Sequence, residues 1–468
     1  PPLPGGEREA AQQQGEGRTR HIPSLVPTTS LIPDFADRVQ AVNRFRALLA
    51  QHSDDLVRLM GQEIHKPEFE ALASDVLPLL ASCTWHIKHA KRVLQDRKPP
   101  GKPLWLLGVS HRVARRPLGR VAIIATWNYP VQLVGVQIVQ AFMGGNEVIV
   151  KPSERSPRTQ ALLLDLFMKA GFKLVRLDPS REAGEELVAK RDFHHLVFTG
   201  STAVGREIAG VLARRLIPST LELSGNDTAI VCTGADVELA AKAIWYAFTL
   251  NHGQTCMAPR RVAVEYDLHE PLLAEFKSLG ELAEPRKLID RSATEWCRQV
   301  GRAALEADGQ LIVGDLEADP LRPIVIASDR TDTALYRGDH FGPLLVVARL
   351  RDEYEPRGPL TLSVFGSKDE SRRWSSLSSA GTMTFNDAII PTGHPGAPLS
   401  AVGNSGWGVS RGVEGLLAMT RPVSISTTPK RVRLPLDPPG TPVSKITPWL
   451  RRLYPVESKA TRTEDSSA

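Results

Sequence analysis

Short apolar runs alternate with longer amphipathic stretches between residues 119 and 216. The runs are four or five residues long, as in strands buried on both faces, while apolar residues in the stretches recur every three or four positions, as in helices. A β-α-β-α-β order carries the chain back after every strand, so neighbouring strands pair in parallel. The sequence therefore predicts an α/β fold with a doubly wound parallel sheet, and ligands at the carboxyl ends of its strands. The predicted strands are 121–125, 147–150, 173–177 and 195–198, and the predicted helices are 131–142, 157–170, 182–190 and 204–216.

The flanking regions extend this plan. Two or three amphipathic helices are expected over 34–94. A second α/β segment begins near Glu222, with a strand at 229–232 and a helix at 238–251, and a chain of 468 residues has room for two large domains. Residues 279–339 are expected only to be mixed α/β. The two ends, 1–20 and 428–468, are polar and rich in Pro, Gly or Arg, and we expect them to be flexible tails.

Composition limits the possible functions. Hydrophobic residues make up 42% of the chain and charged residues 24%, which is typical of a globular protein. Lys and Arg exceed Asp and Glu by 58 to 52, but the basic residues are dispersed, whereas nucleic-acid binding calls for a dense stripe with aromatics. The four cysteines form no CxxC pair, so we expect neither a disulfide framework nor a metal site. Without an apolar run of about 18 residues or a signal-type segment, we expect a soluble, cytoplasmic protein that binds neither nucleic acid nor membrane.

Polar motifs follow the predicted strands at the edge where a ligand would bind. Trp127-Asn128-Tyr129-Pro130 follows the first strand, and Lys151 and Glu154, which are suited to ribose hydroxyls, follow the second. Taken alone, these residues equally describe an aromatic plug and a helix cap. The run from Phe198 to Gly205 has glycines that would let backbone N–H groups approach a pyrophosphate, but an ordinary strand-to-helix turn fits it as well.

Two further motifs contain candidate catalytic groups. Glu222 lies within Leu221-Glu-Leu-Ser-Gly-Asn226, and Cys256 ends the run Gly253-Gln-Thr-Cys256. A lone cysteine is more often a small buried hydrophobic residue than a nucleophile, so its local sequence leaves both interpretations open.

Taken in order, the motifs resemble those of the aldehyde dehydrogenase superfamily. The similar segments are WNYP, KPSE, FTGST..G, LELSGN, GQTC, HFGP and Asn386-Asp387, and they span residues 34 to 422. HKPEFEA at Lys66, WLLGVSHRVARRPLG at Leu106 and GNSGWG at Asn404 are similar to the class 3-like branch, which handles fatty, aromatic and other apolar aldehydes. The resemblance implies NAD(P)-dependent oxidation of an aldehyde to a carboxylic acid.

It also implies a covalent mechanism and a domain plan. Cys256 would attack the aldehyde to form a thiohemiacetal, and Asn128 together with the Cys256 backbone N–H would stabilise the oxyanion. Glu222 would activate the water that hydrolyses the resulting thioester. Asn386 would lie near the substrate pocket. The implied domains are a cofactor domain over 21–221 with a flap at 105–118, a catalytic domain over 222–400, and a return to the cofactor domain with an oligomerisation strand over 401–427.

The implied cofactor is NAD, with NADP possible. Lys151 and Glu154 would bind the adenosine ribose, and the Glu154 carboxylate would repel the extra phosphate of NADP. A homodimer is expected through 109–117 and 423–427. The other residues carried over to cofactor binding are Trp127, Gly200, Ser201, Gly205, Asp339 and Phe341.

The sequence departs from the family pattern at three places. Ser224 replaces a glycine beside the expected base, Asp339 replaces a longer Glu that would hold the nicotinamide ribose, and Asp178-Pro179 stands where glycine is common. These positions bear on rate and cofactor affinity, while every expected catalytic group is present. Two alternative functions are distinguished by these residues. A CoA-acylating or reductive member of the superfamily would generally lack Glu222. A non-catalytic NAD-binding homologue would have lost Cys256, Asn128 or Glu222.

Overall fold

A computed structural model describes residues 33–429, with gaps at 104–105, 107, 339, 352–353 and 355–358, and residues 443–454. The chain divides into two compact units. The first comprises Pro1–Gln95 and Arg115–Pro422, and the second comprises Asp96–Ala114 and Val423–Ala468. The predicted N-terminal tail, 1–20, lies outside the described residues.

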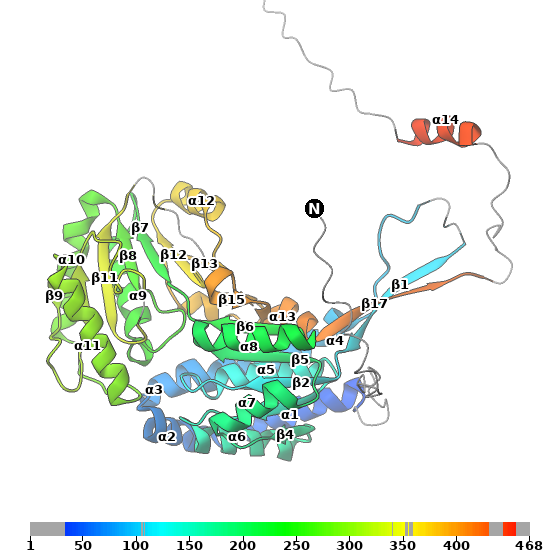
Figure 1. Ribbon diagram of the computed structural model, residues 1–468, viewed down its shortest axis with the longest axis horizontal. Coiled ribbons are helices and arrows are strands. Elements are labelled where there is room, and N and C mark those ends of the chain that lie inside the picture. Colours follow the sequence, from blue (N-terminus) through cyan, green and yellow to red (C-terminus); the bar gives the residue numbers. More distant parts are fainter. Residues whose placement is uncertain are drawn as a thin grey trace, which may run out of the picture. The chain divides into compact units, whose positions relative to one another are not determined.

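The first unit contains the predicted doubly wound sheet (Figure 1). Its six strands have the order β15-β6-β5-β2-β3-β4, and all pair in parallel except β15, which is antiparallel to β6. The order reverses between β2 and β5, which places a ligand crevice at their carboxyl ends. The strands are β2 (Arg120–Ile124), β3 (Glu147–Lys151), β4 (Leu174–Arg176), β5 (His195–Gly200), β6 (Ser219–Leu223) and β15 (Gly406–Trp407).

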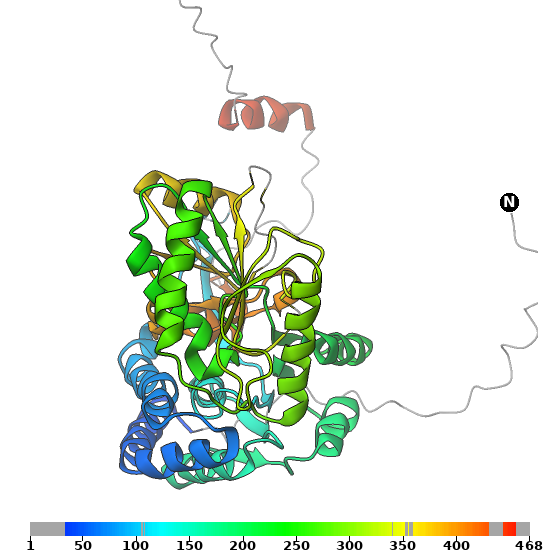
Figure 2. The same ribbon diagram turned by 90° about the vertical axis from the view of Figure 1, so that its left-hand side faces the viewer.

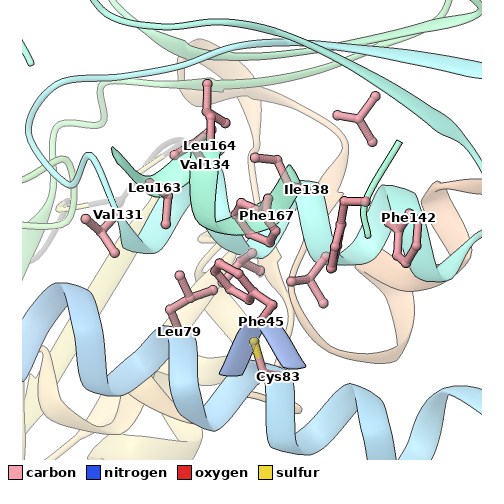
Figure 3. Close-up of a cluster of buried hydrophobic side chains, with 14 of the residues drawn as sticks. Phe45, Leu79, Cys83, Val131, Val134, Ile138, Phe142, Leu163, Leu164 and Phe167 are labelled. Carbon is pink, nitrogen blue, oxygen red and sulfur yellow. The ribbon is translucent and has the colours of Figure 1, made fainter. Parts of the chain in front are cut away.

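Both faces of this sheet are buried, which explains the continuous apolar runs. Val121 and Ile123 pack toward one layer of helices, whereas Ala122 packs toward the other, because successive strand residues point to opposite faces. In the first layer Phe45 and Phe167 stack with ring centroids 3.6 Å apart (Figure 3). That layer is formed by α1 (Phe35–Gln51), α2 (Ser53–Ile64), α4 (Leu77–Leu94), α5 (Gln132–Met143) and α6 (Pro157–Ala170), and the other by α7 (Arg181–Lys190) and α8 (Thr202–Arg215).

A second sheet follows Glu222 along the chain. Its seven strands have the order β13-β12-β7-β8-β11-β10-β9, and only β9 runs antiparallel to its neighbour. Val325 packs toward α9 and α10, and Ile324 toward α11, so this sheet lies between helices on both faces (Figure 2). The strands are β7 (Thr228–Val231), β8 (Arg261–Val264), β9 (Gln310–Val313), β10 (Ile324–Ala327), β11 (Leu344–Arg349), β12 (Thr361–Phe365) and β13 (Thr382–Phe385). The helices are α9 (Val237–Thr249), α10 (Tyr266–Glu281), α11 (Arg291–Glu306) and α12 (Lys368–Leu377).

Several short elements lie outside the two sheets. Helix α3 (Glu68–Ala71) passes through a π-helical turn, Leu72–Val76, into α4. Strands β14 (Leu399–Ser400) and β16 (Val409–Ser410) pair with each other, and helix α13 (Gly412–Ala418) follows.

The second unit contains most of a two-stranded sheet formed by β1 (Ser110–Pro117) and β17 (Thr420–Thr427). It also contains α14 (Val443–Leu453), in a segment where the sequence analysis expects a flexible tail. The prediction fails at this helix because its Pro448 and basic residues suggested an irregular chain. Among the described residues no helix is both long and apolar enough to span a membrane.

Candidate active site

Cys256 lies in a loop with unusual backbone geometry. After α9, the 3₁₀ turn Leu250–Gly253 has left-handed φ angles at Asn251 (51°), His252 (53°) and Gly253 (73°). A Cβ at Gly253 would lie 2.4 Å from the backbone of Gly342, so this position requires glycine. The close approach brings the loop of the candidate nucleophile against the HFGP motif.

Side-chain hydrogen bonds to backbone groups hold this loop. The Asn251 amide donates to the carbonyl oxygens of Asn128 (3.1 Å) and Gln254 (3.2 Å). The Thr255 hydroxyl donates to the Leu250 carbonyl (3.0 Å) and contacts the Tyr129 hydroxyl at 2.7 Å. Every one of these side chains except that of Tyr129 belongs to the loop itself, so the loop is fixed largely by its own sequence.

Arg260 braces the same loop from within the protein. Its guanidinium donates to the carbonyls of Gly253 (2.9 Å) and Thr255 (2.8 Å), and its side chain is buried. The guanidinium carbon also lies 5.3 Å from the centre of the Phe341 ring. Arg260 is not among the residues predicted from the sequence, because an arginine is usually a surface residue and nothing in the local sequence marks this one as buried.

A cavity of about 340 Å³ opens onto the Cys256 thiol. Its walls are mostly apolar or aromatic, and Arg411 supplies a cation. The apolar and aromatic residues that line it are Phe69, Ala73, Pro78, Tyr129, Leu133, Tyr246, Leu250, Met257, Ile389 and Ile390. A cavity of this kind suits the apolar body of a small molecule.

Charges around Cys256 oppose one another. Burial raises the pKa of the Cys256 thiol to about 12, and the carboxylates of Asp227 and Glu222 add to that rise. Arg411 and Arg260 act in the other direction. Burial also raises the pKa of Asp227 to about 7, although its carboxyl group accepts a hydrogen bond from the Thr361 backbone N–H at 2.6 Å. The ionisation of the thiol therefore depends on the balance between two acidic and two basic side chains.

Asn128 follows β2 and points its amide at the nucleophile loop. The amide nitrogen donates to the Gln254 carbonyl at 3.0 Å, while the amide oxygen accepts a hydrogen bond from the Thr126 hydroxyl at 2.8 Å. These two contacts fix which end of the amide faces Cys256. The Asn128 backbone carbonyl in turn accepts a hydrogen bond from buried Lys66 at 2.7 Å.

Glu222 lies in β6, and its side chain is almost entirely buried. One carboxylate oxygen accepts hydrogen bonds from the Thr199 hydroxyl (3.1 Å) and the Gln137 amide (3.3 Å). The other oxygen is buried and has no hydrogen-bond partner among the described residues. One oxygen is thus anchored while the other remains available, and a buried acceptor of this kind normally has a partner.

A second cavity, of about 490 Å³, lies at the carboxyl ends of β2, β3 and β5 and beside α7 and α8. Lys151 and Glu154 form an ion pair of 2.8 Å at its wall. Trp127 also lines it and meets the Phe341 ring edge-on, with centroids 5.9 Å apart. The crevice predicted from the strand order and the polar motifs therefore exists and is large enough for part of a dinucleotide.

The remaining candidate residues are placed as follows. Ser201 caps α8 by accepting a hydrogen bond from the Val204 backbone, and a Cβ at Gly205 would lie 2.4 Å from Leu223, so this glycine lets α8 approach β6. Gly200 lines the second cavity beside Phe198. Ser224 is exposed, with its side chain outside both cavities, and Asp339 lies outside the described residues. Asn386 does not line the Cys256 cavity, and its amide oxygen accepts a hydrogen bond from the Gly366 backbone at 3.1 Å.

Comparison with known proteins identifies the family. The family model described as "Aldehyde dehydrogenase family" matches residues 33–425, which is most of the chain. The chain belongs to the aldehyde dehydrogenase family. This aldehyde dehydrogenase is 30% identical to a 4,4'-diapolycopene aldehyde oxidase of Methylomonas, covering 87% of this chain and 80% of the relative. It is also 30% identical to a probable coniferyl aldehyde dehydrogenase of Pseudomonas aeruginosa, covering 89% and 92%.

Further relatives bear on the branch and the fold. Family 3 member A2 from Rattus norvegicus is 27% identical over 80% of this chain and 81% of its own length, which confirms the class 3-like resemblance. Among solved structures, AldH of Staphylococcus aureus has a TM-score of 0.81 at 22% identity, covering 91% of this chain and 96% of that one. This aldehyde dehydrogenase is therefore an oxidoreductase that oxidises an aldehyde with NAD(P), as the sequence predicts.

Proposed function

We propose that this aldehyde dehydrogenase converts an apolar or aromatic aldehyde to its acid through a covalent intermediate on Cys256. The observation that carries the proposal is the Cys256 thiol, which faces an apolar cavity beside a pre-oriented amide and a half-anchored carboxylate. These are the three groups that acyl chemistry on sulfur requires: a nucleophile, an oxyanion donor and a base.

In the first half of the reaction the Cys256 sulfur, after its proton has left to solvent, attacks as the thiolate and forms a bond to the aldehyde carbon. The carbonyl π electrons move onto oxygen, where the Asn128 amide N–H and the Cys256 backbone N–H stabilise the negative charge. The amide nitrogen of Asn128 carries two hydrogens. One is donated to the Gln254 carbonyl, which leaves the other for a hydrogen bond to the oxyanion. When bound, the nicotinamide supplies the acceptor for the hydride that leaves the former aldehyde carbon, and Cys256 then carries a thioester.

In the second half Glu222 acts as the base. Its unpartnered oxygen takes a proton from a water molecule as the water oxygen bonds to the thioester carbon, and the carbon–sulfur bond then breaks to release the acid and the thiolate. The anchored oxygen, held by Thr199 and Gln137, keeps the carboxylate in one orientation during this step. A carboxylate in this place favours hydrolysis over transfer to coenzyme A.

The size and place of the second cavity support the proposal that it holds the cofactor, and the domain division implied by the resemblance remains part of this proposal. Lys151 and Glu154 would hold the adenosine ribose, and Glu154 favours NAD over NADP through charge repulsion. Ser201, at the N-terminus of α8, is suited to the pyrophosphate, with Gly200 and Gly205 permitting close approach. Trp127 and Phe341 would flank the nicotinamide side, together with Asp339.

The substrate class rests on the lining of the Cys256 cavity. Its walls are mainly aromatic and aliphatic, so an unsaturated or aromatic aldehyde gains more from burial there than a polar one. The relatives named for diapolycopene and coniferyl aldehydes are consistent with this class. Asn386 stays a candidate for contacts with larger substrates.

We also propose a cytoplasmic homodimer. All four cysteines are free, as in proteins of a reducing compartment. Among the described residues, strands β1 and β17 form a two-stranded ladder, with one further bridge between Arg97 and Val113, and the exposed edge of such a small sheet is suited to pairing with a second copy.

A spectrophotometric screen tests the proposed function. Reduced cofactor is followed with short, long-chain and aromatic aldehydes, each with NAD and with NADP. We expect aromatic or long-chain aldehydes with NAD to give the highest kcat/KM, and Cys256→Ala to abolish the signal. Cys83→Ala, which removes one sulfur atom from the core, is the matched control and should retain activity. Full turnover by Cys256→Ala would refute the covalent mechanism.

A further inference from the structure

Arg411 has a backbone conformation that arginine rarely adopts. It lies between β16 and α13 with φ 61° and ψ 167°, a region reached almost only by glycine. The Gln140 side chain accepts a hydrogen bond from its backbone N–H at 3.2 Å, and its carbonyl accepts one from Gly415 at 2.9 Å. A glycine would fit this position better, so the arginine side chain itself is a reason to look for a function here.

The Arg411 guanidinium faces the cavity that contains Cys256. One terminal nitrogen donates to the Thr392 carbonyl at 2.8 Å, which orients the group. The Nε–H is buried and has no hydrogen-bond partner among the described residues. The side chains on which the Arg411 charge acts are Glu222, Cys256 and Tyr129. Arg411 is therefore a cation with uncommitted donors beside a thiol.

Arg260, the second cation near Cys256, differs from Arg411 in how its hydrogen-bond donors are used. Arg260 donates to the backbone carbonyls of Gly253 and Thr255, so its terminal nitrogens serve the loop. Its side chain is almost completely buried, whereas Arg411 reaches the cavity wall. Of the two guanidiniums, only that of Arg411 shares the cavity surface with the sulfur.

We propose that Arg411 is a positioning residue whose guanidinium increases the fraction of Cys256 that is present as the reactive thiolate. This inference rests on the proposed role of Cys256 as nucleophile, and it adds a group that the motifs of the resemblance do not contain. A thiolate attacks an aldehyde far faster than a thiol does, so a fixed cation beside the sulfur increases the reactive fraction. The positive charge of Arg411, rather than the shape of its side chain, carries the effect.

The expected pH behaviour follows from every charged group that acts on the sulfur. Burial, Asp227 and Glu222 raise the pKa of Cys256, while Arg411 and Arg260 lower it. Tyr129 is neutral at working pH because burial raises its pKa. Removal of Arg411 leaves Arg260 alone against both carboxylates, so the thiol should ionise at higher pH.

The test measures the rate at which iodoacetamide alkylates Cys256 in the full-length enzyme as a function of pH, with the modified peptide quantified by mass spectrometry. The variants are Arg411→Gly, which suits the backbone, and Arg411→Lys, which keeps the charge. Arg44→Gln is the matched control, because Arg44 is also an arginine that donates to a backbone carbonyl, that of Ala170, but it lies outside both cavities.

We expect the alkylation midpoint of Arg411→Gly to rise by about one pH unit, which slows alkylation about tenfold below the midpoint. Arg411→Lys should lie between this variant and the wild type, and Arg44→Gln should match the wild type. Thermal unfolding of Arg411→Gly should occur at an unchanged or higher temperature, because glycine relieves the backbone conformation. A purely structural role predicts instead that stability falls and that the pH midpoint stays constant.

Two outcomes would overturn the proposal: identical pH midpoints in wild type and Arg411→Gly, or a midpoint in Arg411→Lys no closer to the wild type than that of Arg411→Gly. If the midpoints are identical but KM for aldehydes that carry a carboxylate rises in Arg411→Gly, the cation serves the substrate instead. Alkylation needs neither aldehyde nor cofactor, so its result is distinguishable from a failure of the proposed function, which the Cys256→Ala turnover assay reports.

Discussion

Replacement of Lys66 by Met tests how the oxyanion donor is held in place. The Lys66 ammonium lies 2.6 Å from the Asp75 carboxylate, and both side chains are completely buried. It also donates to the Asn128 carbonyl at 2.7 Å and lies 3.7 Å from the centre of the Tyr129 ring. Asp75 in turn accepts hydrogen bonds from the backbone N–H groups of Val131 and Gln132, at the start of α5.

The magnitude follows from the burial of this ion pair. Lys66→Met keeps the length of the side chain but leaves the Asp75 charge without its cation, and breaking a buried pair on one side costs about 3–5 kcal/mol of the free energy of unfolding. Asp75 keeps its two backbone donors, which favours the lower end of the range. The double variant Lys66→Met/Asp75→Asn should lose less than the sum of the single variants, since no uncompensated charge remains.

Urea unfolding of the wild type, both single variants and the double variant measures these differences. Lys242→Met is the control, because its ion pair with Glu238 is exposed and should contribute nothing measurable. Turnover should also fall in Lys66→Met, in kcat more than in KM, because the Asn128 amide loses its support. A loss of stability below about 1 kcal/mol, the range of a surface pair, would refute the reasoning.

Two further predictions concern the carboxylates near Cys256. Glu222→Gln should keep a burst of one reduced cofactor per site but slow the steady-state rate by at least about a hundredfold, because an amide cannot take the proton of water. Pre-steady-state absorbance measures both phases. An unchanged steady-state rate would exclude Glu222 as the base. Burial raises the folded pKa of Asp227 to about 7, above the unfolded value near 3.9. Its contribution to stability is therefore complete below about pH 4 and is lost as the pH rises through about 7. Unfolding of the wild type and Asp227→Asn at pH 5 and pH 8 should show a smaller decline in the variant, and equal declines would contradict the assigned pKa.

The strands of both sheets were predictable where burial on both faces gives a continuous apolar run in the sequence. The strand over 121–125 and the helix over 157–170 correspond to β2 and α6 within one residue at each end. In the region 279–339 this signal was incomplete: the buried strand β10 (Ile324–Ala327) has such an apolar run, but β9 does not. Strand β9 is a partly exposed edge strand and begins with Gln310, so it lacks the apolar run that reveals a central strand.

The reactive groups of the candidate site could be predicted from the sequence, but the residues that hold them in place could not. Motif order led to Cys256, Asn128 and Glu222, but the left-handed turn before Cys256 depends on contacts with Gly342, some ninety residues away in the sequence. Local propensity carries no information on contacts of that range. Arg260 and Arg411 were not predicted as site residues for a related reason. An arginine is usually a surface residue, and only the folded chain shows that the charges of these two act on the nucleophile.

The two halves of the reaction place opposite demands on one buried site, and Arg411 is suited to meet both. In the first half Cys256 and Glu222 are both anions in a region where burial disfavours charge, so a shared cation reduces their repulsion. Once the sulfur carries the acyl group it is neutral, and the charge of Arg411 then acts mainly on Glu222. Loss of Arg411 should therefore slow both the burst and the steady state, whereas a role limited to the thiol would slow only the burst.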